Sequence, residues 1–321
     1  MSELNLGNYS MIDNQLKILL YHGVTNCTSS GIENNSGKHI DSKIFQFEMQ
    51  YIKDNCNVLS MSDVISVFES KKSIPKNSVA VTFDDGFANN YSVAAPILKA
   101  LEIPATFYIT TGIIGTDKMF WVDQLESCIN LTHKTEIAVF LGDDQCVFNL
   151  SDNEYKIEAL KKIKKYCKNI HPSKKDKVVE MVSYETGVIP SVNQGPNYRA
   201  MTWEEVQEMN SDPLFTFGGH NVTHDTLSYL SRDEMRQQIR CSIEELEENL
   251  GEVVENYSYP EGQSNHFNNE VILFLQENGI KCCPTAINGI NTLGDDLFHL
   301  KRIMVGMANI KFPYKIESQI K

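Results

Sequence analysis

The amino-acid sequence predicts an α/β fold in which a parallel sheet carries polar side chains at one end of its strands. Short apolar runs that suit buried strands alternate along the chain with longer segments of helical periodicity. Three of these apolar runs lead into side chains that can bind metals or transfer protons: His22, Asp84 and His220. Because parallel strands share one functional end, we expect these side chains to lie close together.

The composition is typical of a soluble globular protein. Hydrophobic residues make up 41% of the 321 residues and charged residues 22%, which suits one large α/β domain or two smaller ones. The net charge of −13 argues against non-specific binding to nucleic acid and against an anionic membrane surface. No apolar run approaches the ~18 residues of a spanning helix. We therefore expect neither a nucleic-acid partner nor stable membrane insertion.

The start of the chain and its cysteines indicate a cytoplasmic location. Residues 1–8 contain neither the basic stretch nor the apolar stretch of a secretory signal peptide. The eight cysteines form no Cys-x-x-Cys pair and show no metal-ligand spacing. Such cysteines fit free thiols or small buried hydrophobic residues in a reducing compartment better than they fit disulfides. We therefore expect the protein in the cytoplasm.

The first third of the chain predicts strands with helices between them. A polar arm over residues 1–15 precedes a buried strand over residues 17–21. Asp41 is expected to cap a helix, and Ser62 to start a second one. The apolar positions of the first helix recur at helical spacing: Ile44, Phe47, Tyr51 and Ile52. The next elements are a strand, a helix and a strand, at residues 79–83, 92–101 and 104–110.

Residues 116–200 interrupt this alternation and predict an α+β insertion within a single domain of residues 1–321. The insertion should contain a hairpin and then two helices, at residues 136–141, 145–149, 155–168 and 174–184. We interpret its lysine-rich helix as a solvated face and not as a nucleic-acid surface. Trp121, Asp123 and Arg199 near its ends could present a ring and charges to a sugar, although a core position for Trp121 is equally compatible. We expect the insertion to govern substrate choice.

The last third of the chain returns to alternating elements. Capping boxes of the type Ser/Thr-x-x-Glu begin at Thr202 and Ser231, and the second opens a helix that ends at Leu250 before Gly251. The other predicted elements are strands at residues 214–217, 256–259, 280–286 and 301–305 and a helix at residues 271–278. The sequence therefore continues the parallel arrangement to its end.

Two adjacent carboxylates end the central strand. The buried strand over residues 79–83 leads directly to Asp84, Asp85 and Gly86. Neighbouring side chains at a strand end point in different directions, so that one carboxylate can bind a cation while the other stays free as a base. Gly86 permits a sharp turn or a close approach to a ligand. An ordinary turn between a strand and a helix would explain the same three residues.

A pair of histidines follows the strand at residues 214–217. On a helical turn, the imidazoles of His220 and His224 would share one face, and a carboxylate from a neighbouring strand would complete a three-ligand site for a divalent metal. A His-x-x-x-His pair alone is often a surface or capping feature. In combination with the strand-terminal Asp84 and Asp85 it indicates a metal centre.

These segments together resemble the NodB-homology polysaccharide deacetylases, carbohydrate esterase family 4. The resemblance rests on TFDDG at residues 82–86, GGHNVTH at residues 218–224 and YPEG at residues 259–262. LLYHGV at residues 19–24 and KRIMV at residues 301–305 are similar to the branch with circularly permuted motifs, in which the catalytic acid precedes the Asp-Asp motif. The resemblance implies a distorted (β/α)7-type barrel that carries the α+β insertion.

The same resemblance assigns roles to the predicted site residues. It implies that Asp85, His220 and His224 hold a divalent metal, most simply Zn²⁺, and that Asp84 is the catalytic base. His22 would then protonate the departing amine, whereas a lone histidine is otherwise more often structural. The metal would polarise a carbonyl and acidify a water molecule.

Two further residues are site candidates because the sequence departs from the family pattern. Glu261 stands where the family most often has an aromatic residue, and it could disfavour anionic substrates or bond to a sugar hydroxyl. The backbone N–H beside it would help to hold the oxyanion. The arginine that orients the catalytic aspartate in unpermuted members is absent before Pro260, and Arg302 is the candidate substitute. A surface ion pair is the alternative for Arg302.

The resemblance implies a hydrolase that removes an N-acetyl or N-formyl group from an amino sugar in cell-envelope glycan biosynthesis. With a cytoplasmic location expected, we favour a small, nucleotide-linked or lipid-linked glycan as its substrate over a finished polymer. Two alternatives stay open: hydrolysis of a non-sugar amide or cyclic imide, and a catalytically silent sugar-binding module. The silent module predicts the loss of a metal ligand or of the base, and the sequence lacks none of them.

Overall fold

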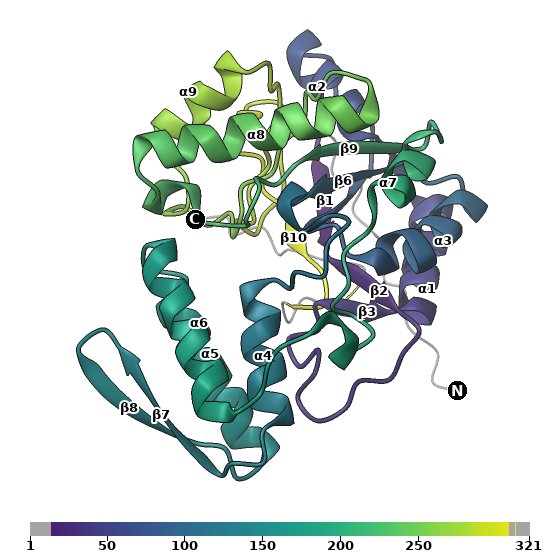
Figure 1. Ribbon diagram of the computed structural model, residues 1–321. Helices are drawn as coiled ribbons and strands as arrows, with labels where there is room; N and C mark the ends of the chain where they lie inside the picture. The colour runs from purple at the N-terminus through teal and green to yellow at the C-terminus, as the bar shows by residue number, and fades with distance from the viewer. Residues whose placement is uncertain (1–13, 308–311, 313–321) are drawn as a thin grey trace, which may run out of the picture.

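A six-stranded parallel sheet forms the centre of the molecule (Figure 1). The computed structural model describes residues 14–307 and residue 312, so the arm expected over residues 1–15 lies almost entirely outside the described residues. The strand order is β10–β1–β5–β6–β9, with β4 paired to β5, and every pairing is parallel as predicted. The strands are β1 Leu16–Tyr21, β4 Asn57–Val58, β5 Ser78–Phe83, β6 Ala105–Ile109, β9 Phe215–Gly219 and β10 Ile303–Met304.

The register of the inner strands aligns their carboxyl ends. Tyr21 lies opposite Phe83, Phe83 opposite Phe107, and Phe107 opposite Phe217. The rings of these four residues form a row with centroid separations of 5.4, 4.9 and 5.6 Å. Every residue of β5 is buried, as expected for a strand covered on both faces. The residues that follow these strands are thereby brought to one edge of the sheet.

Helices pack around the sheet and mostly begin where the sequence predicts (Figure 1). Asp41 caps α1 by accepting from the N–H groups of Lys43 and Ile44, and both predicted capping boxes, at Thr202 and Ser231, are present. These helices are α1 Ser42–Asn55, α2 Met61–Ser70, α3 Ala95–Ala100, α7 Trp203–Asn210, α8 Arg232–Leu250 and α9 Asn269–Glu277. A π-helical turn at Asn90–Ala94 leads into α3, and the two together overlap the helix predicted at residues 92–101.

Two details of the predicted helices are wrong. The cap of α2 is Ser60 and not Ser62, because the side chain of Asp63 completes a capping box with Ser60. In α1, Ile44 and Phe47 are 52% and 62% exposed, whereas Phe45 and Met49 are buried with Ile52. The buried face of this helix is therefore rotated by about one residue from the face that the apolar spacing indicated.

The predicted strands at residues 256–259 and 280–286 are reduced to isolated bridges, between Gly219 and Tyr257 and between Asn256 and Cys282. Pro260 and Pro284 follow the bridge residues Tyr257 and Cys282 within three positions and cannot donate to a ladder. Single backbone hydrogen bonds continue onward from β9, including those from Ser258 to Gly219 and from Tyr257 to Cys282. Among the described residues the strand pairings run from β10 to β9 without closing on each other, so the α/β fold is confirmed and the distorted (β/α)7-type barrel is not.

The segment expected as an insertion has a hydrophobic cluster of its own beside the sheet (Figure 1). Its elements are α4 Trp121–Leu131, the antiparallel hairpin of β7 Glu136–Leu141 and β8 Asp144–Asn149, α5 Asn153–Cys167 and α6 Pro172–Thr186. Trp121 belongs to this cluster and is 7% exposed. A short parallel pair, β2 Gly23–Thr25 with β3 His39–Asp41, lies between β1 and α1 in the chain. Among the described residues, no helix is long and apolar enough to cross a bilayer.

Candidate metal centre

The two aspartates after β5 face different partners. The N–H of Asp84 still donates to the carbonyl of Tyr21 at 2.9 Å, which extends the pairing of β5 with β1 by one residue. The backbone then turns, because Asp85 and Gly86 have φ values of 79° and 92°. Both aspartates are buried, at 4% and 5% exposure. The turn directs Asp84 to an arginine and Asp85 to two histidines.

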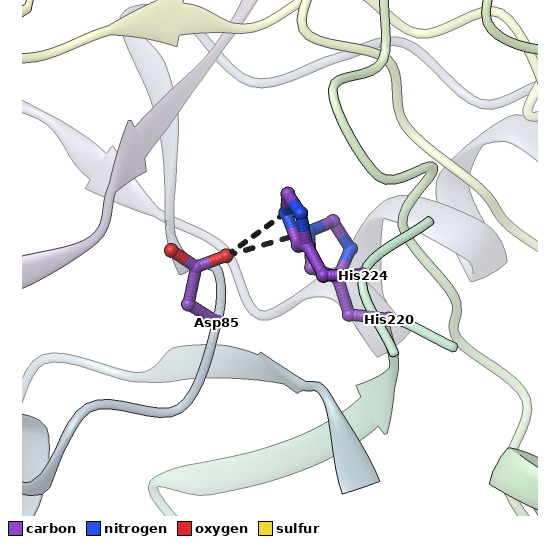
Figure 2. Close-up of side chains that lie close together, drawn as sticks. All are labelled: Asp85, His220 and His224. Atoms are coloured by element: carbon purple, nitrogen blue, oxygen red, sulfur yellow. Dashed lines mark ion pairs between the residues drawn. The ribbon is translucent and has the colours of Figure 1, made fainter. Parts of the chain in front are cut away.

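Asp85, His220 and His224 converge on one point at the edge of the sheet (Figure 2). Oδ1 of Asp85 lies 3.3 Å from Nε2 of His224 and 3.7 Å from Nε2 of His220. One donor atom from each residue lies within 4.8 Å of the other two. A carboxylate and two imidazoles at this spacing form a donor set that suits a divalent ion such as Zn²⁺ and leaves positions for other ligands.

His220 is oriented as a metal ligand would be. Its Nδ1 lies 2.8 Å from the carbonyl oxygen of Ser258, which only accepts, so the proton is on Nδ1. Nε2 therefore offers its lone pair toward Asp85. Burial is the largest cause that lowers the pKa of His220, to about 4, which keeps the ring neutral at neutral pH. Among the described residues, Oδ1 of Asp85 and Nδ1 of His224 have no hydrogen-bond partner, which also fits a site that binds a ligand.

The histidines are held by a loop, and the helical turn expected at residues 220–224 is absent. Asn221 organises this loop with its side chain: Oδ1 accepts from the N–H of His224 at 2.5 Å, and Nδ2 donates to the carbonyl of Asp225 at 2.7 Å. The N–H of Asn221 donates to the hydroxyl of Tyr257 at 2.8 Å. Asn221 and His224 have φ values of 53° and 59°, which a regular helix excludes. The two imidazoles thus converge through a left-handed turn.

Arg302, which directly precedes β10, is buried and holds Asp84. Its Nη1 and Nη2 each donate at 2.7 Å to one of the two carboxylate oxygens of Asp84, and Nη2 also donates to the hydroxyl of Ser258 at 2.8 Å. Arg302 is fully buried, so the alternative of a surface ion pair is wrong. Burial by itself raises the pKa of Asp84, but the charge of Arg302 is the largest opposing cause, and the pKa lies below its usual value. Asp84 is therefore ionised and fixed in orientation.

His22 follows β1 directly and lies among the same charges. Burial is the largest cause that lowers its pKa, while Asp85 and Asp84 raise it and Lys38 and Arg302 lower it. Its Nδ1 is buried and has no hydrogen-bond partner within residues 14–307. A neutral imidazole at this place can exchange a proton with a group bound beside Asp84 and Asp85.

Glu261 is tied to the segment that was expected as an insertion. Its Oε2 lies 2.5 Å from Nζ of Lys168, which follows α5, and the charge of Lys168 lowers the pKa of Glu261 against the raising effect of burial. A second pair joins Lys175 of α6 to Asp225 at 2.5 Å, one residue beyond His224. Ion pairs thus join the loop at Asp225 and the turn at Glu261 to the helices of the segment at residues 116–200.

Sequence reasoning missed two residues beside His22. His39 is 4% exposed and accepts at Nδ1 from Asn89 at 2.9 Å, because Oδ1 of Asn89 accepts from the N–H of Val24. Lys38 pairs with Asp123 at 2.5 Å, and Asp85 is among the charges that raise its pKa after the opposing effect of burial. The pairing of β2 with β3 brings both residues to the site, and no local sequence pattern predicts this pairing.

The three residues with open roles at the ends of the predicted insertion lie in different surroundings. Trp121 is packed in the cluster of that segment, and Asp123 is 2% exposed and paired with Lys38. Arg199 donates to Glu205, the partner of Thr202 in the capping box of α7, and the Arg199 side chain is 47% exposed. Asp123 lies beside Lys38, and Trp121 borders a small cavity that His224 and Glu261 also line, whereas Arg199 is engaged with Glu205.

Comparison with known proteins agrees with this arrangement. The family model described as polysaccharide deacetylase matches residues 71–139 and 150–283, more than half of the chain. Poly-beta-1,6-N-acetyl-D-glucosamine N-deacetylase of Staphylococcus aureus strain MSSA476 is 30% identical over 111 residues, and the matched part covers 34% of this chain and 38% of that protein. The chain thus spans well under two thirds of the length of the curated relatives that it matches.

Solved structures share the fold over nearly the whole chain. Deacetylase PplD of Streptococcus pyogenes, in complex with acetate, superimposes with a TM-score of 0.60 at 19% identity, covering 92% of this chain and 94% of that one. IcaB of Ammonifex degensii gives a TM-score of 0.58 at 17% identity, covering 91% and 92%. At these identities the likeness shows the fold alone. Together with the match to the family model, the fold and the site lead to one conclusion: the chain belongs to the polysaccharide deacetylase family.

Proposed function

We propose that this protein is a metal-dependent hydrolase that removes the N-acetyl group from an amino sugar of a cell-envelope glycan. One observation carries the proposal: a complete Asp-His-His donor set lies beside a second aspartate that a buried arginine holds ionised. A silent sugar-binding module would have no need for both features. The name of the matched Staphylococcus aureus relative supports an N-acetyl-D-glucosamine polymer as the substrate class.

The residues of the site have separate roles in amide hydrolysis. Asp85, His220 and His224 would hold a divalent ion, for which Zn²⁺ is the expectation. Such an ion polarises the amide carbonyl and acidifies a water molecule. Asp84 accepts a proton from the attacking water as the new C–O bond forms, and Arg302 keeps the carboxylate aligned for this transfer. His22, which is neutral before the reaction, must take up a proton to act as the acid; as an imidazolium it then donates this proton to the amine nitrogen as the C–N bond breaks, so that acetate and a free amine leave.

Glu261 has a supporting role in this scheme. Its carboxylate is engaged with Lys168, so it is not free to act as a second base. Glu261 forms a turn with Pro260 and Gly262, and its φ of 62° lies in a region that non-glycine residues rarely adopt. We propose that this turn supplies the backbone donor for the oxyanion, and that the Glu261–Lys168 pair holds the turn in place.

Acetate release tests the proposal directly. Purified protein is loaded with Zn²⁺, its metal content is measured, and it is incubated with N-acetylglucosamine, its β-1,6-linked oligomers, a nucleotide-linked N-acetylamino sugar and a cyclic imide. We expect stoichiometric metal and release of acetate from at least one N-acetylated sugar. Turnover of the cyclic imide alone would favour the non-sugar amide alternative, and glycan binding without any turnover would favour the silent module. The same panel decides between polymeric and precursor substrates.

A further inference from the structure

Lys38 brings a buried positive charge into the site, beside the expected proton donor. In the parallel pair of β2 with β3, Gly23 lies opposite His39, and the N–H of Gly23 donates to the carbonyl of Lys38 at 3.3 Å. One residue earlier, the same register places His22 opposite Lys38. Residues that lie opposite each other in a ladder extend to the same face of it, so the side chains of His22 and Lys38 lie on one side.

A carboxylate and an aromatic ring fix the ammonium group of Lys38 in this place. The group pairs with Oδ1 of Asp123 at 2.5 Å and lies 4.5 Å from the centre of the Phe87 ring. The side chains of Lys38 and Asp123 are only 11% and 3% exposed. Phe87 follows Asp85 by two residues, so the ammonium group lies close to the turn that carries a proposed metal ligand. Lys38 is therefore a fixed cation of the site and not a solvated surface lysine.

The positive end of this ion pair faces the site. Burial lowers the pKa of His22 most, and the charges of Lys38 and Arg302 lower it further. Asp123 is not among the main charges that act on the pKa of His22. Burial also lowers the pKa of Lys38, but Asp123 and then Asp85 raise it beyond this effect, so the ammonium group stays charged. The carboxylate of Asp123 thus lies behind the ammonium group, as seen from His22.

The proposed reaction changes the charge of the bound sugar on this side of the site. The N-acetyl group is neutral, whereas the free amine that forms takes up a proton from solution near and below neutral pH and becomes an ammonium ion. The amine nitrogen lies within hydrogen-bond reach of His22 when it receives its proton, and therefore on the face that Lys38 occupies. Two positive charges that are several ångströms apart in a buried site repel each other strongly.

We infer that Lys38 makes the site select acetylated amino sugars and reject deacetylated ones, including the product of the reaction. This inference rests on the proposed function, because removal of the acyl group is what converts a neutral substrate into a cationic product. The repulsion speeds release of the product and keeps the protein from binding units of a glycan that are already deacetylated. Asp123 holds the ammonium group in place and limits the repulsion, since its negative charge partly offsets that of Lys38.

Binding of three monosaccharide probes, measured without turnover, tests this role of Lys38. The probes are the methyl β-glycosides of N-acetylglucosamine, glucosamine and glucose. They are titrated into the Zn²⁺-loaded Asp84→Asn variant, which we expect to be inactive, at pH 6, where the amine of glucosamine is charged. Saturation-transfer NMR gives the dissociation constants. We expect the N-acetylglucosamine probe to bind best, and the glucosamine probe to bind at least about tenfold more weakly than the uncharged glucose probe.

Variants of the ion pair, made in the same background, should change this ratio in opposite directions. Lys38→Met/Asp123→Asn removes both charges and should bring the affinities for the glucosamine and glucose probes to within about threefold of each other. Asp123→Asn alone keeps the ammonium group without its counter-charge, so it should weaken binding of the glucosamine probe further and leave the glucose probe unchanged. The single variant also provides the test if the double variant does not fold. Lys162→Met/Glu158→Gln, an exposed pair on α5, is the matched control and should preserve the ratio.

Three results would overturn the inference: equal binding of the glucosamine and glucose probes in the parent, a ratio that neither ion-pair variant changes, or no binding of any probe. The acetate assay reports on the proposed function separately. Acetate release without the expected ratio would reject the role of Lys38 and keep the hydrolase. The expected ratio without acetate release would keep the selection by charge at Lys38 and reject the hydrolase.

Discussion

At the scale of single residues, Asp84 and Asp85 show how two identical neighbours acquire different roles. Asp85 lies opposite two imidazoles, whereas both oxygens of Asp84 accept from Arg302. The difference arises because the backbone turns to a φ of 79° at Asp85. Three predictions follow from the contacts of these side chains.

The first prediction separates metal binding from proton transfer. Asp84→Asn should keep the bound metal and lower kcat by about 10²–10⁴, because it removes the base and spares the ligands. His220→Ala should lose both the metal and turnover, since it removes one of the three donors. Metal content by atomic absorption and acetate release are the measurements. Equal metal loss in the two variants would reverse the assignment of Asp84 and Asp85.

The second prediction concerns the buried pair of Arg302 with Asp84. Arg302→Met leaves an uncompensated carboxylate in the core, so the free energy of unfolding should fall by about 3–5 kcal/mol. Combining it with Asp84→Asn removes the orphaned charge and should restore part of that loss. Urea denaturation, analysed with the same m-value for all variants, measures both changes in the free energy of unfolding. A double variant that is no more stable than Arg302→Met would show that the pair is not the source of the stabilisation.

The third prediction uses Arg302→Lys to test whether Asp84 needs both of its hydrogen bonds from Arg302. The substitution keeps the positive charge but loses the planar fork that contacts both oxygens of Asp84. We expect the stability to fall less than in Arg302→Met, while kcat falls and KM changes little. Wild-type kcat in Arg302→Lys would mean that charge alone, and not orientation, is what Asp84 requires.

At the scale of elements, the loop after β9 replaces the expected helical turn. Asn221 holds this loop through three hydrogen bonds, to His224, Asp225 and Tyr257. The loop is irregular, so its shape depends on specific contacts and not on a repeating backbone pattern; besides those of Asn221, Gln238 accepts from the N–H groups of Val222 and Thr223. The Asn221 side chain is therefore placed to orient His224, the second of the two histidines.

The fourth prediction follows from this loop. Asn221→Ala should weaken metal binding about 10–100-fold, because it removes the groups that orient His224. Asn221→Asp is the matched control, since it keeps the acceptor for the N–H of His224 and should lose less affinity. Competition with a fluorescent chelator measures both dissociation constants. Unchanged affinity in Asn221→Ala would show that the loop holds its shape without this side chain.

At the scale of the whole molecule, the metal ligands come from loops that are distant in sequence and meet only after folding. Asp85 follows β5, and the histidines follow β9, which is separated from β5 by the whole segment at residues 116–200. A metal that binds here binds the folded state alone. Metal binding and global stability are therefore coupled.

The fifth prediction tests that coupling. Zn²⁺ at about 100 times its dissociation constant should stabilise the protein by about 2.7 kcal/mol and raise Tm, and removing it with a chelator should reverse the change. His220→Ala should abolish the shift, while His133→Ala, which removes an exposed histidine, should keep it. Thermal unfolding followed by circular dichroism provides the measurement. An equal shift in His220→Ala would place the bound metal elsewhere.

Much of the fold follows from local rules of the sequence. The caps at Asp41, Thr202 and Ser231 were predictable because each side chain bonds to backbone groups within three residues. The strands at residues 79–83 and 104–110 were predictable from their continuous apolar runs. The bridges near Pro260 and Pro284, and the rotation of α1, depend on partners far along the chain, so local patterns did not reveal them.

The sequence by itself determined the parallel arrangement of the strands and the set of side chains with suitable chemistry at their ends, and its motifs resembled a family to which the family model then assigned the chain. Only the tertiary structure showed that Arg302 donates hydrogen bonds to Asp84 and that Lys38 and His39 lie beside His22. It also showed that Lys168 and Lys175 form ion pairs with two loops of the site. The physical reason is the separation along the chain of the residues that interact. Helix caps and apolar runs act between neighbours, whereas a buried ion pair joins residues whose proximity only the packed sheet creates.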